Sequence, residues 1–178
     1  MKFTKNMSEV TVETGMPEAG GYILKCIKSE SKKSKAGNDM LELELEPIWS
    51  DSEGHLMAGR FKFNLKTYTV FADDAGLSRL KGVLTAFQHS NPTKLTEKDV
   101  NGDSFDENRL VSLQIGAVLR EEEYLNNKNE PRIGLKVFYL CSTQSIAEKK
   151  YKVPPCKTLE TGHKQADNQA ADQKEIPF

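Results

Sequence analysis

Apolar and polar side chains alternate along three stretches in the first half of the chain. Apolar residues recur at every second position in residues 21–28, 40–46 and 60–66. This is the period of a β-strand rather than that of a helix. The segment 29–39 has no apolar residue larger than alanine, and its Gly37-Asn38 pair can supply the positive φ of a hairpin turn. We therefore predict a three-stranded meander with a loop at 29–39 and a third strand that continues to Phe71.

The period then changes to that of a helix. Apolar residues recur at spacings of three and four between Leu77 and Phe87, an aspartate pair precedes them, and Asn91-Pro92 follows. Aspartate is a common helix cap, and a residue before proline disfavours the helical conformation. These signals predict an amphipathic helix over residues 74–89.

The second half predicts a short helical turn and two further strands. The polar stretch 93–108 contains one predicted helical turn at 96–100. Alternating apolar residues then predict a fourth strand region over 110–124 and a fifth strand over 132–141. The polar residues between these strands predict a hairpin connection.

Three strands, one helix and two strands follow in the order of the small Greek-key barrel called the OB-fold. We therefore predict a mainly β fold, a five-stranded OB-fold-like barrel with one helix between its third and fourth strands. A roll or an open α+β sheet would produce the same order. Residues 157–175 contain only one large aliphatic side chain, Leu159. This composition predicts a folded domain over 1–156 and a disordered tail over 157–178.

Charge and cysteine content limit the class of protein. The 25 Lys and Arg nearly cancel the 26 Asp and Glu, so any surface that binds nucleic acid must be local. The three cysteines, Cys26, Cys141 and Cys156, are odd in number and far apart, which is typical of reduced cysteines in a cytosolic protein. No stretch resembles a signal peptide or a membrane span, so we expect a cytoplasmic protein.

Binding a single strand without sequence preference requires cations that follow the phosphates and rings on which bases stack. The candidate cations lie in the first hairpin loop and on the third and fifth strands: Lys32, Lys33, Lys35, Arg60, Lys62, Lys66, Arg132 and Lys136. The candidate rings lie opposite the aliphatic stripe or near a strand end: Trp49, Tyr68, Tyr124 and Phe138. Phe138 alternates out of phase with the stripe from Ile133 to Tyr139. An outward phenylalanine would be explained by a stacked base or by a partner subunit of a homo-oligomer.

A charge ladder is the alternative interpretation of the strand lysines. The second strand carries three outward glutamates that can pair across the sheet with three lysines: Glu42, Glu44 and Glu46 with Lys25, Lys62 and Lys66. The loop lysines have only Glu30 and Asp39 nearby, so they are the stronger candidates for phosphate contact. Trp49 fits base stacking and structural packing equally well.

The sequence contains no evident catalytic arrangement. The histidines share no short spacing with one another or with a cysteine. The Glu121–Glu123 run and the glutamates of the second strand could hold magnesium for nuclease chemistry, but strand alternation explains the second set more simply. We expect no enzymatic activity, no cofactor and no metal site.

Four short stretches together resemble one protein family. They are Pro17–Tyr22, Lys32–Asn38 leading into Met40–Leu43, Glu121–Tyr124 and Lys152–Pro155. Over residues 17–159 the chain is similar to phage-encoded single-stranded DNA-binding proteins, a family first described as a domain of unknown function. The resemblance implies an OB-like fold and a role in replication or recombination of a phage or prophage in its bacterial host.

The last three residues resemble the tip of bacterial single-stranded DNA-binding proteins, which end in an acidic linker and Ile-Pro-Phe. Here Ile176, Pro177 and Phe178 follow two acidic residues, with Lys174 interrupting them. A terminal phenylalanine offers a ring and a carboxylate to an apolar pocket rimmed by Arg or Lys. The resemblance implies that the tip binds a phage or host replication or recombination protein.

The leading hypothesis is therefore a non-enzymatic protein that protects single-stranded DNA with little sequence preference and recruits partners through its tail. The alternative is a protein-interaction module of the phage replication machinery that uses the same fold and tip but binds no DNA.

Overall fold

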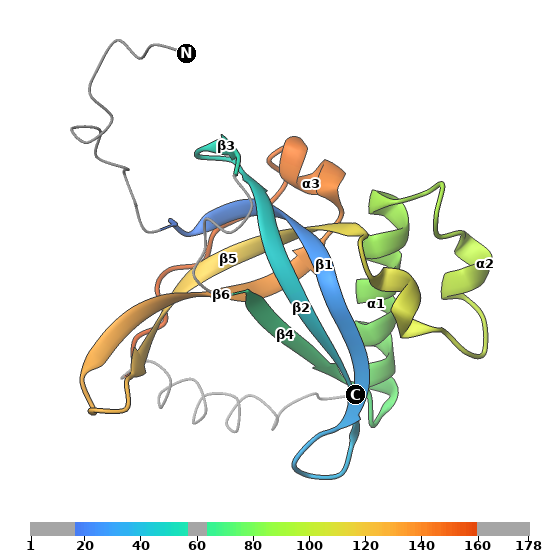
Figure 1. Cartoon of the computed structure of the whole chain (residues 1–178), viewed down its shortest axis with the longest axis horizontal. Coiled ribbons are helices and arrows are strands. Elements are labelled where there is room, and N and C mark those ends of the chain that lie inside the picture. The colour runs from blue at the N-terminus through green and yellow to red at the C-terminus, as the bar shows by residue number, and fades with distance from the viewer. Residues whose placement is uncertain (1–16, 57–63, 160–178) are drawn as a thin grey trace, which may run out of the picture.

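The computed structural model describes residues 17–56 and 64–159 (Figure 1). One antiparallel sheet contains six strands: β1 (Gly20–Lys33), β2 (Asp39–Ser50), β3 (Gly54–His55), β4 (Leu65–Val70), β5 (Gln114–Leu125) and β6 (Pro131–Cys141). The helical segments are α1 (Asp74–Ser90), α2 (Glu97–Val100), the 3₁₀ helix η2 (Glu107–Leu110) and α3 (Thr143–Ala147). The mainly β class is confirmed.

The sheet is ordered β3-β2-β1-β5-β6, and β4 also pairs with β2. The pairing of β1 with β2 and of β2 with β4 confirms the predicted meander, although the predicted start of its third strand, residues 60–63, lies outside the described residues. The sheet bends until β6 contacts β4 (Figure 1), but no ladder joins these two strands in the described part of the chain. The sheet is thus not closed, so the predicted barrel is not confirmed, and β3 is a sixth strand that the prediction lacked.

The β1–β2 hairpin is longer than its apolar pattern predicts. Alternate apolar side chains of both strands are buried, as expected. However, β1 also extends through the polar residues 29–33, which pair in register with β2, because a ladder needs backbone partners rather than apolar side chains. The loop shrinks to residues 34–38. Lys32 and Lys33 therefore lie on a strand, and their placement in a loop was wrong.

Helix α1 closes the core against the sheet, within one residue of the predicted range. The Asp73 carboxylate accepts a hydrogen bond of 2.6 Å from the first turn, and the helix ends at Asn91. Leu84 and Phe87 are buried in one cluster with the strand residues. The Asn91 side chain donates to the backbone carbonyl of Gln114 at 2.7 Å, which fixes the end of the helix to the start of β5.

The connection from α1 to β5 is more ordered than its polar sequence suggests. The predicted helical turn at 96–100 is α2. It is followed by η2, which the prediction lacked and which ends at the buried Leu110. The next strand, β5, therefore starts at Gln114 rather than at residue 110. Arg109 donates to the Asp99 carboxylate at 2.6 Å, and the Thr96 backbone N–H donates to the same carboxylate at 2.8 Å. These hydrogen bonds, with that from Arg109 the strongest influence, hold the pKa of Asp99 well below its usual range.

A bulge in β6 changes which side chains face the core. Val137 and Tyr139 pair with consecutive residues of β5, so Phe138 has no partner opposite it. Such an extra residue shifts the alternation of every side chain that follows. After the bulge Leu140 packs against the core and Tyr139 does not. Of the predicted inward stripe only Leu135 and Val137 pack against the core, since Ile133 is exposed.

We call the face of the sheet opposite this core the outer face. Its β1–β5 end is covered by α3 and the residues that follow. Ile146 of α3 and Val118 of β5 are fully buried but lie outside the main core cluster. A Cβ added at Gly116 would lie 2.5 Å from the Ser142 carbonyl oxygen, so this close approach requires glycine.

The last described residues run beside β5. Tyr151 donates a hydrogen bond to the Asp51 carboxylate. Farther on, the Lys157 backbone N–H donates to the Glu121 carbonyl at 3.0 Å, and the Glu123 N–H donates to the Lys157 carbonyl at 2.8 Å. Residues 157–159 thus follow β5 toward the β5–β6 hairpin.

Candidate nucleic-acid interface

Two hairpin tips and β4 form the part of the sheet that α3 leaves uncovered. In Figure 1 the β1–β2 tip projects beyond the body of the sheet at the bottom, and the β5–β6 tip projects beyond it at the lower left. Gly37 has a φ of +83° in the first tip, and Asn129 has a φ of 58° in the second. In the second tip the Asn126 side chain accepts hydrogen bonds from two backbone N–H groups, at 2.8 and 3.0 Å. Both turns therefore have defined backbone conformations.

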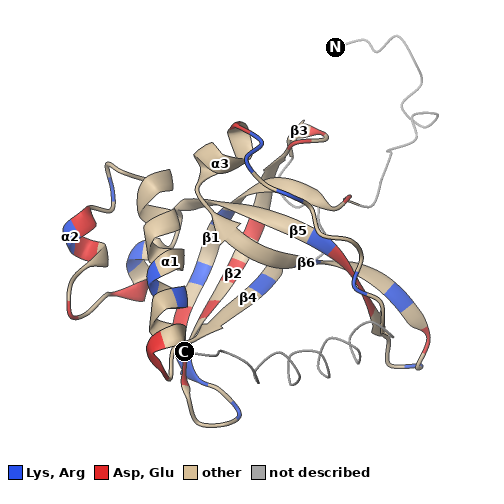
Figure 2. Ribbon diagram, turned by 180° about the vertical axis from the view of Figure 1, so that it is seen from behind, with Lys and Arg blue, Asp and Glu red and all other residues tan. Residues whose placement is uncertain are grey.

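Acidic and basic side chains alternate across the outer face between these tips. Figure 2 shows acidic positions on β2 beside basic positions on β1 and β4. Lys32 lies 3.1 Å from Glu30 and 3.0 Å from Glu42, and Lys66 lies 4.0 Å from Glu44. The hydrogen bond to Glu42, followed by that to Glu30, raises the pKa of Lys32. The charge-ladder interpretation thus holds for Lys66, and it extends to Lys32, which the sequence placed in a loop.

Each tip carries an exposed lysine that forms no ion pair with a described residue. Lys33 lies 2.7 Å from Asp39. Lys35 in the same hairpin and Lys128 in the other are exposed, and neither forms an ion pair with a described residue. Exposed lysines without a carboxylate partner are the cations that a phosphate can approach without first displacing a protein group.

The β5–β6 hairpin has its own ion pairs. Arg132 lies 3.1 Å from Glu130, and Lys136 lies 3.2 Å from Glu122. Glu122 also contacts Lys157 at 3.2 Å. Partial burial opposes ionisation of Glu122, but the hydrogen bonds from both lysines outweigh it and lower its pKa.

Three of the four predicted rings are exposed. Tyr68 on β4 is 67 % exposed, Phe138 is 46 % exposed and Tyr124 is 44 % exposed. The Tyr124 ring lies over Gly134, where an added Cβ would be 3.0 Å from the ring. The guanidinium of Arg120 lies 4.8 Å from the centroid of the Phe138 ring. Each exposed ring thus has a cation beside or opposite it, since Tyr68 follows Lys66 by two residues and Tyr124 pairs with Arg132.

The predicted residues form two groups. One group lies on β1, β2 and β4 and contains Lys32, Lys33, Lys35, Lys66 and Tyr68. The other lies on β5 and β6 and contains Tyr124, Arg132, Lys136 and Phe138. Trp49 joins neither group, because it is half-buried at the far end of β2, paired with Ile23 and His55.

Five predicted residues cannot be placed. Arg60, Lys62, Ile176, Pro177 and Phe178 lie outside the described residues. The sequence prediction also missed two cations of the second group, Arg120 and Lys128. Lys128 could have been found because it lies in the predicted β5–β6 connection. Arg120 could not, because its place beside Phe138 depends on the bulge.

No cluster of three or more His, Cys, Asp or Glu side chains that could hold a metal ion occurs in residues 17–56 and 64–159. Burial raises the pKa values of Cys26 and Cys141 to about 11, which keeps both thiols protonated at neutral pH. Within the same residues, no helix has the length and apolar character needed to cross a membrane.

No protein-family model matches this chain, and no match was found among curated proteins. The family resemblance of the four sequence stretches therefore stays a prediction.

Proposed function

We propose that this chain binds single-stranded DNA, protecting it largely without sequence preference during replication or recombination of a phage or prophage. The observation that carries the proposal is the set of three exposed rings on one sheet, each with a cation beside or opposite it. Stacking on a ring is worth about 1–3 kcal/mol per base and tolerates any sequence, because every base has a π-face.

The strand order supports an OB-type fold as part of this proposal. β1, β2 and β4 form a meander and β1 also pairs with β5, which pairs with β6. A ladder between β4 and β6 would complete a five-stranded barrel. OB-folds bind oligonucleotides on the face of their second and third strands and on the loops that follow the first and fourth strands. These elements correspond here to β2, β4 and the two hairpin tips.

The distribution of charge suggests how the strand would be held. Phosphates meet the unpaired Lys35 and Lys128 first, while Lys32 and Lys66 are already bound to carboxylates. The neutral outer face between the tips repels phosphates less than bare glutamates would, and it leaves Tyr68 free for a base. Stacking then supplies much of the affinity, with a small number of phosphate contacts at the tips.

The tail completes the proposal. Ile176, Pro177 and Phe178 would recruit a phage or host replication or recombination protein, because they form an apolar segment after a long polar stretch. The tail would leave the folded part beside β5, where residue 159 ends the described chain.

Fluorescence anisotropy of a labelled oligo-dT tests DNA binding by the two tips. We expect the Lys35→Glu/Lys128→Glu variant to bind about tenfold more weakly than the unmodified chain, a loss of about 1.4 kcal/mol. The matched control is Lys94→Glu/Lys98→Glu, which makes the same charge change at exposed lysines near α2. Equal weakening by both variants would contradict a role for the tips.

A protein-interaction module without DNA binding is the second candidate. The exposed apolar side chains Leu125 and Ile133 on the β5–β6 hairpin favour it, since they could contact a protein as well as a base. No binding of oligo-dT by the unmodified chain at low salt would reject DNA binding and leave this candidate. Loss of labelled DNA only when magnesium is added would instead indicate a nuclease.

A further inference from the structure

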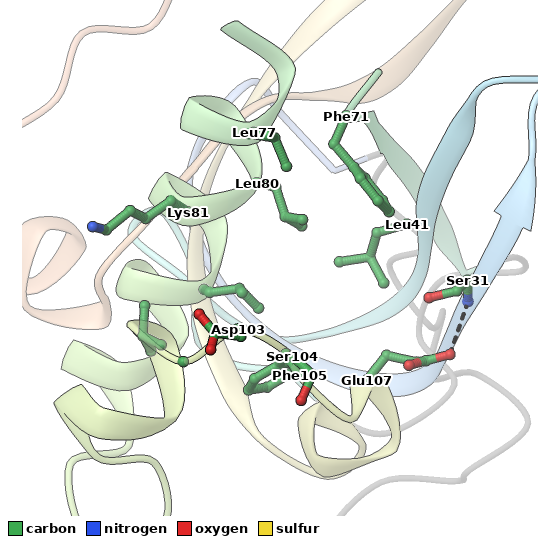
Figure 3. A pocket seen from close by; sticks show the side chains of 13 residues that line it. Ser31, Leu41, Phe71, Leu77, Leu80, Lys81, Asp103, Ser104, Phe105 and Glu107 are labelled. Atoms are coloured by element: carbon green, nitrogen blue, oxygen red, sulfur yellow. Dashed lines mark hydrogen bonds between the residues drawn. The ribbon is translucent and has the colours of Figure 1, made fainter. Parts of the chain in front are cut away.

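A pocket of about 340 Å³ lies between α1, the start of β2 and the segment that leads into η2 (Figure 3). Its walls are mainly apolar: Leu41, Phe71, Leu77, Leu80, Leu84, Val100 and Phe105. Figure 3 shows Leu77 and Leu80 pointing from α1 toward Phe71 and Leu41 across the cavity. Leu77 is 51 % exposed at this site. The volume is within the range of about 300–1,000 Å³ that is usual for ligand pockets.

We propose that this pocket holds Ile176, Pro177 and Phe178 of the same chain. They are the large apolar side chains of residues 160–178. Transfer of such side chains from water into an apolar cavity is favourable by roughly 1.5–3 kcal/mol for each one fully buried. The exposed wall at Leu77 would be covered by the same contact.

The chain between the folded part and this segment is long enough to reach the pocket. Sixteen residues separate Leu159 from Ile176. A flexible chain of that length spans about 20–25 Å on average and about 55 Å when extended. The radius of gyration of a folded domain of this size is about 14 Å. A tether of this kind holds its end at a local concentration on the order of millimolar, so weak contacts suffice for docking.

The charges at the pocket match those of the tail. Lys81 and Asp103 are among the lining residues, and Lys81 forms no ion pair with a described residue. Immediately before the apolar segment the tail has Lys174 and Glu175. The lining has one cation, Lys81, and two carboxylates, Asp103 and Glu107. Docking would bring Lys174 toward a carboxylate and Glu175 toward Lys81, whereas a uniformly acidic tail would meet repulsion from Asp103 and Glu107.

Docking in this pocket would hide the segment that recruits partners. A partner would have to compete with the chain's own pocket, so its apparent affinity would fall by the fraction of tails that are undocked. The inference rests on the proposed role of the tip, but it does not require DNA binding. Its test therefore contains no DNA.

The test uses a labelled peptide of residues 168–178 and a 178-residue chain with Ile176→Ser and Phe178→Ser. We expect the peptide to bind this tip variant at least tenfold more tightly than it binds the unmodified chain, whose pocket is filled by its own tail. Adding Leu77→Glu to the tip variant should abolish binding. The matched control adds Leu125→Glu, because Leu125 is also 51 % exposed but lies on the β5–β6 hairpin.

Thermal unfolding of each variant checks that both glutamate substitutions leave the fold intact. Three results would overturn the inference. The peptide could fail to bind the tip variant, it could bind the unmodified chain equally well, or Leu77→Glu and Leu125→Glu could have equal effects. Oligo-dT binding is measured separately, so loss of DNA binding and loss of tail docking are distinguishable.

Discussion

Two glycines show how differently one added methyl group acts in this chain. A Cβ at Gly116 would lie 2.5 Å from the Ser142 carbonyl oxygen, whereas a Cβ at Gly82 in α1 would meet nothing within 4 Å. We expect Gly116→Ala to lower the free energy of unfolding by about 1–3 kcal/mol, because α3 must move away from β5. Gly82→Ala should raise it by up to about 1 kcal/mol, since alanine favours a helix. Urea unfolding measures both, and a neutral Gly116→Ala would mean that α3 is not packed as described.

The ion pairs of the outer face depend on register, which the sequence does not reveal. The irregularity between Cys26 and Lys28 places Glu30 directly opposite Glu42. Two facing carboxylates repel each other unless cations lie between them, and Lys32 bridges both. Without the irregularity each partner would shift by one position. Sequence reasoning could therefore identify the charged residues but not their pairs.

At the scale of elements, segments with a strong periodicity of apolar residues were predicted correctly, and segments with a weak periodicity were not. The alternation of β1 and β2 and the helical spacing of α1 were sufficient to identify them. α3 could not be predicted, because it has one buried side chain, Ile146, which lies against Gly116 of β5, far away in the chain. The bulge at Phe138 was equally hidden, since the sequence alternates smoothly through it.

The segment after α3 offers a test at the scale of an element. We expect Tyr151→Phe to lower the free energy of unfolding by about 0.5–1.5 kcal/mol, because Asp51 loses its hydrogen-bond donor. The control is Tyr68→Phe, since the Tyr68 side chain is exposed and has no hydrogen bond to a described residue.

Partial burial and the hydrogen bond to Asp51 raise the pKa of Tyr151 to about 12. A raised pKa favours the neutral phenol in the folded state, so its contribution is complete below about pH 10 and is lost as the pH rises toward 12. Ultraviolet absorbance of the phenolate should therefore show one tyrosine titrating later in the unmodified chain than in Tyr151→Phe. Identical titrations would contradict the contact.

For the whole molecule, strand order was predictable and closure was not. The order followed from the sequence of periods along the chain. Closure depends on the tilt and stagger of all strands together, and the described ladders leave β4 and β6 in contact but unpaired. Small differences in twist decide that outcome, and residue patterns do not encode them visibly.

The near-zero net charge gives a prediction for the whole molecule. The formal net charge is −1, so the salt dependence of DNA binding would come from local contacts alone. If Lys35 and Lys128 each neutralise one phosphate, log K should fall with log salt at a slope of about −1.4, at roughly 0.7 per phosphate. The Lys35→Glu/Lys128→Glu variant should show a flatter slope. An unchanged slope would place the phosphate contacts elsewhere.

The ladder between β1 and β5 also determines the order of events during synthesis. It joins Gly20 to Leu119 and Lys25 to Gln114. Strand β1 therefore emerges from a ribosome long before β5, its second neighbouring strand, has been synthesised. At about 5–20 residues per second, that delay is on the order of 5–20 s. The β1–β2 hairpin can form within microseconds, but one edge of β1 must then wait unpaired. Nascent chains halted before residue 114 are therefore expected to aggregate or bind chaperones, whereas chains released after residue 159 should not.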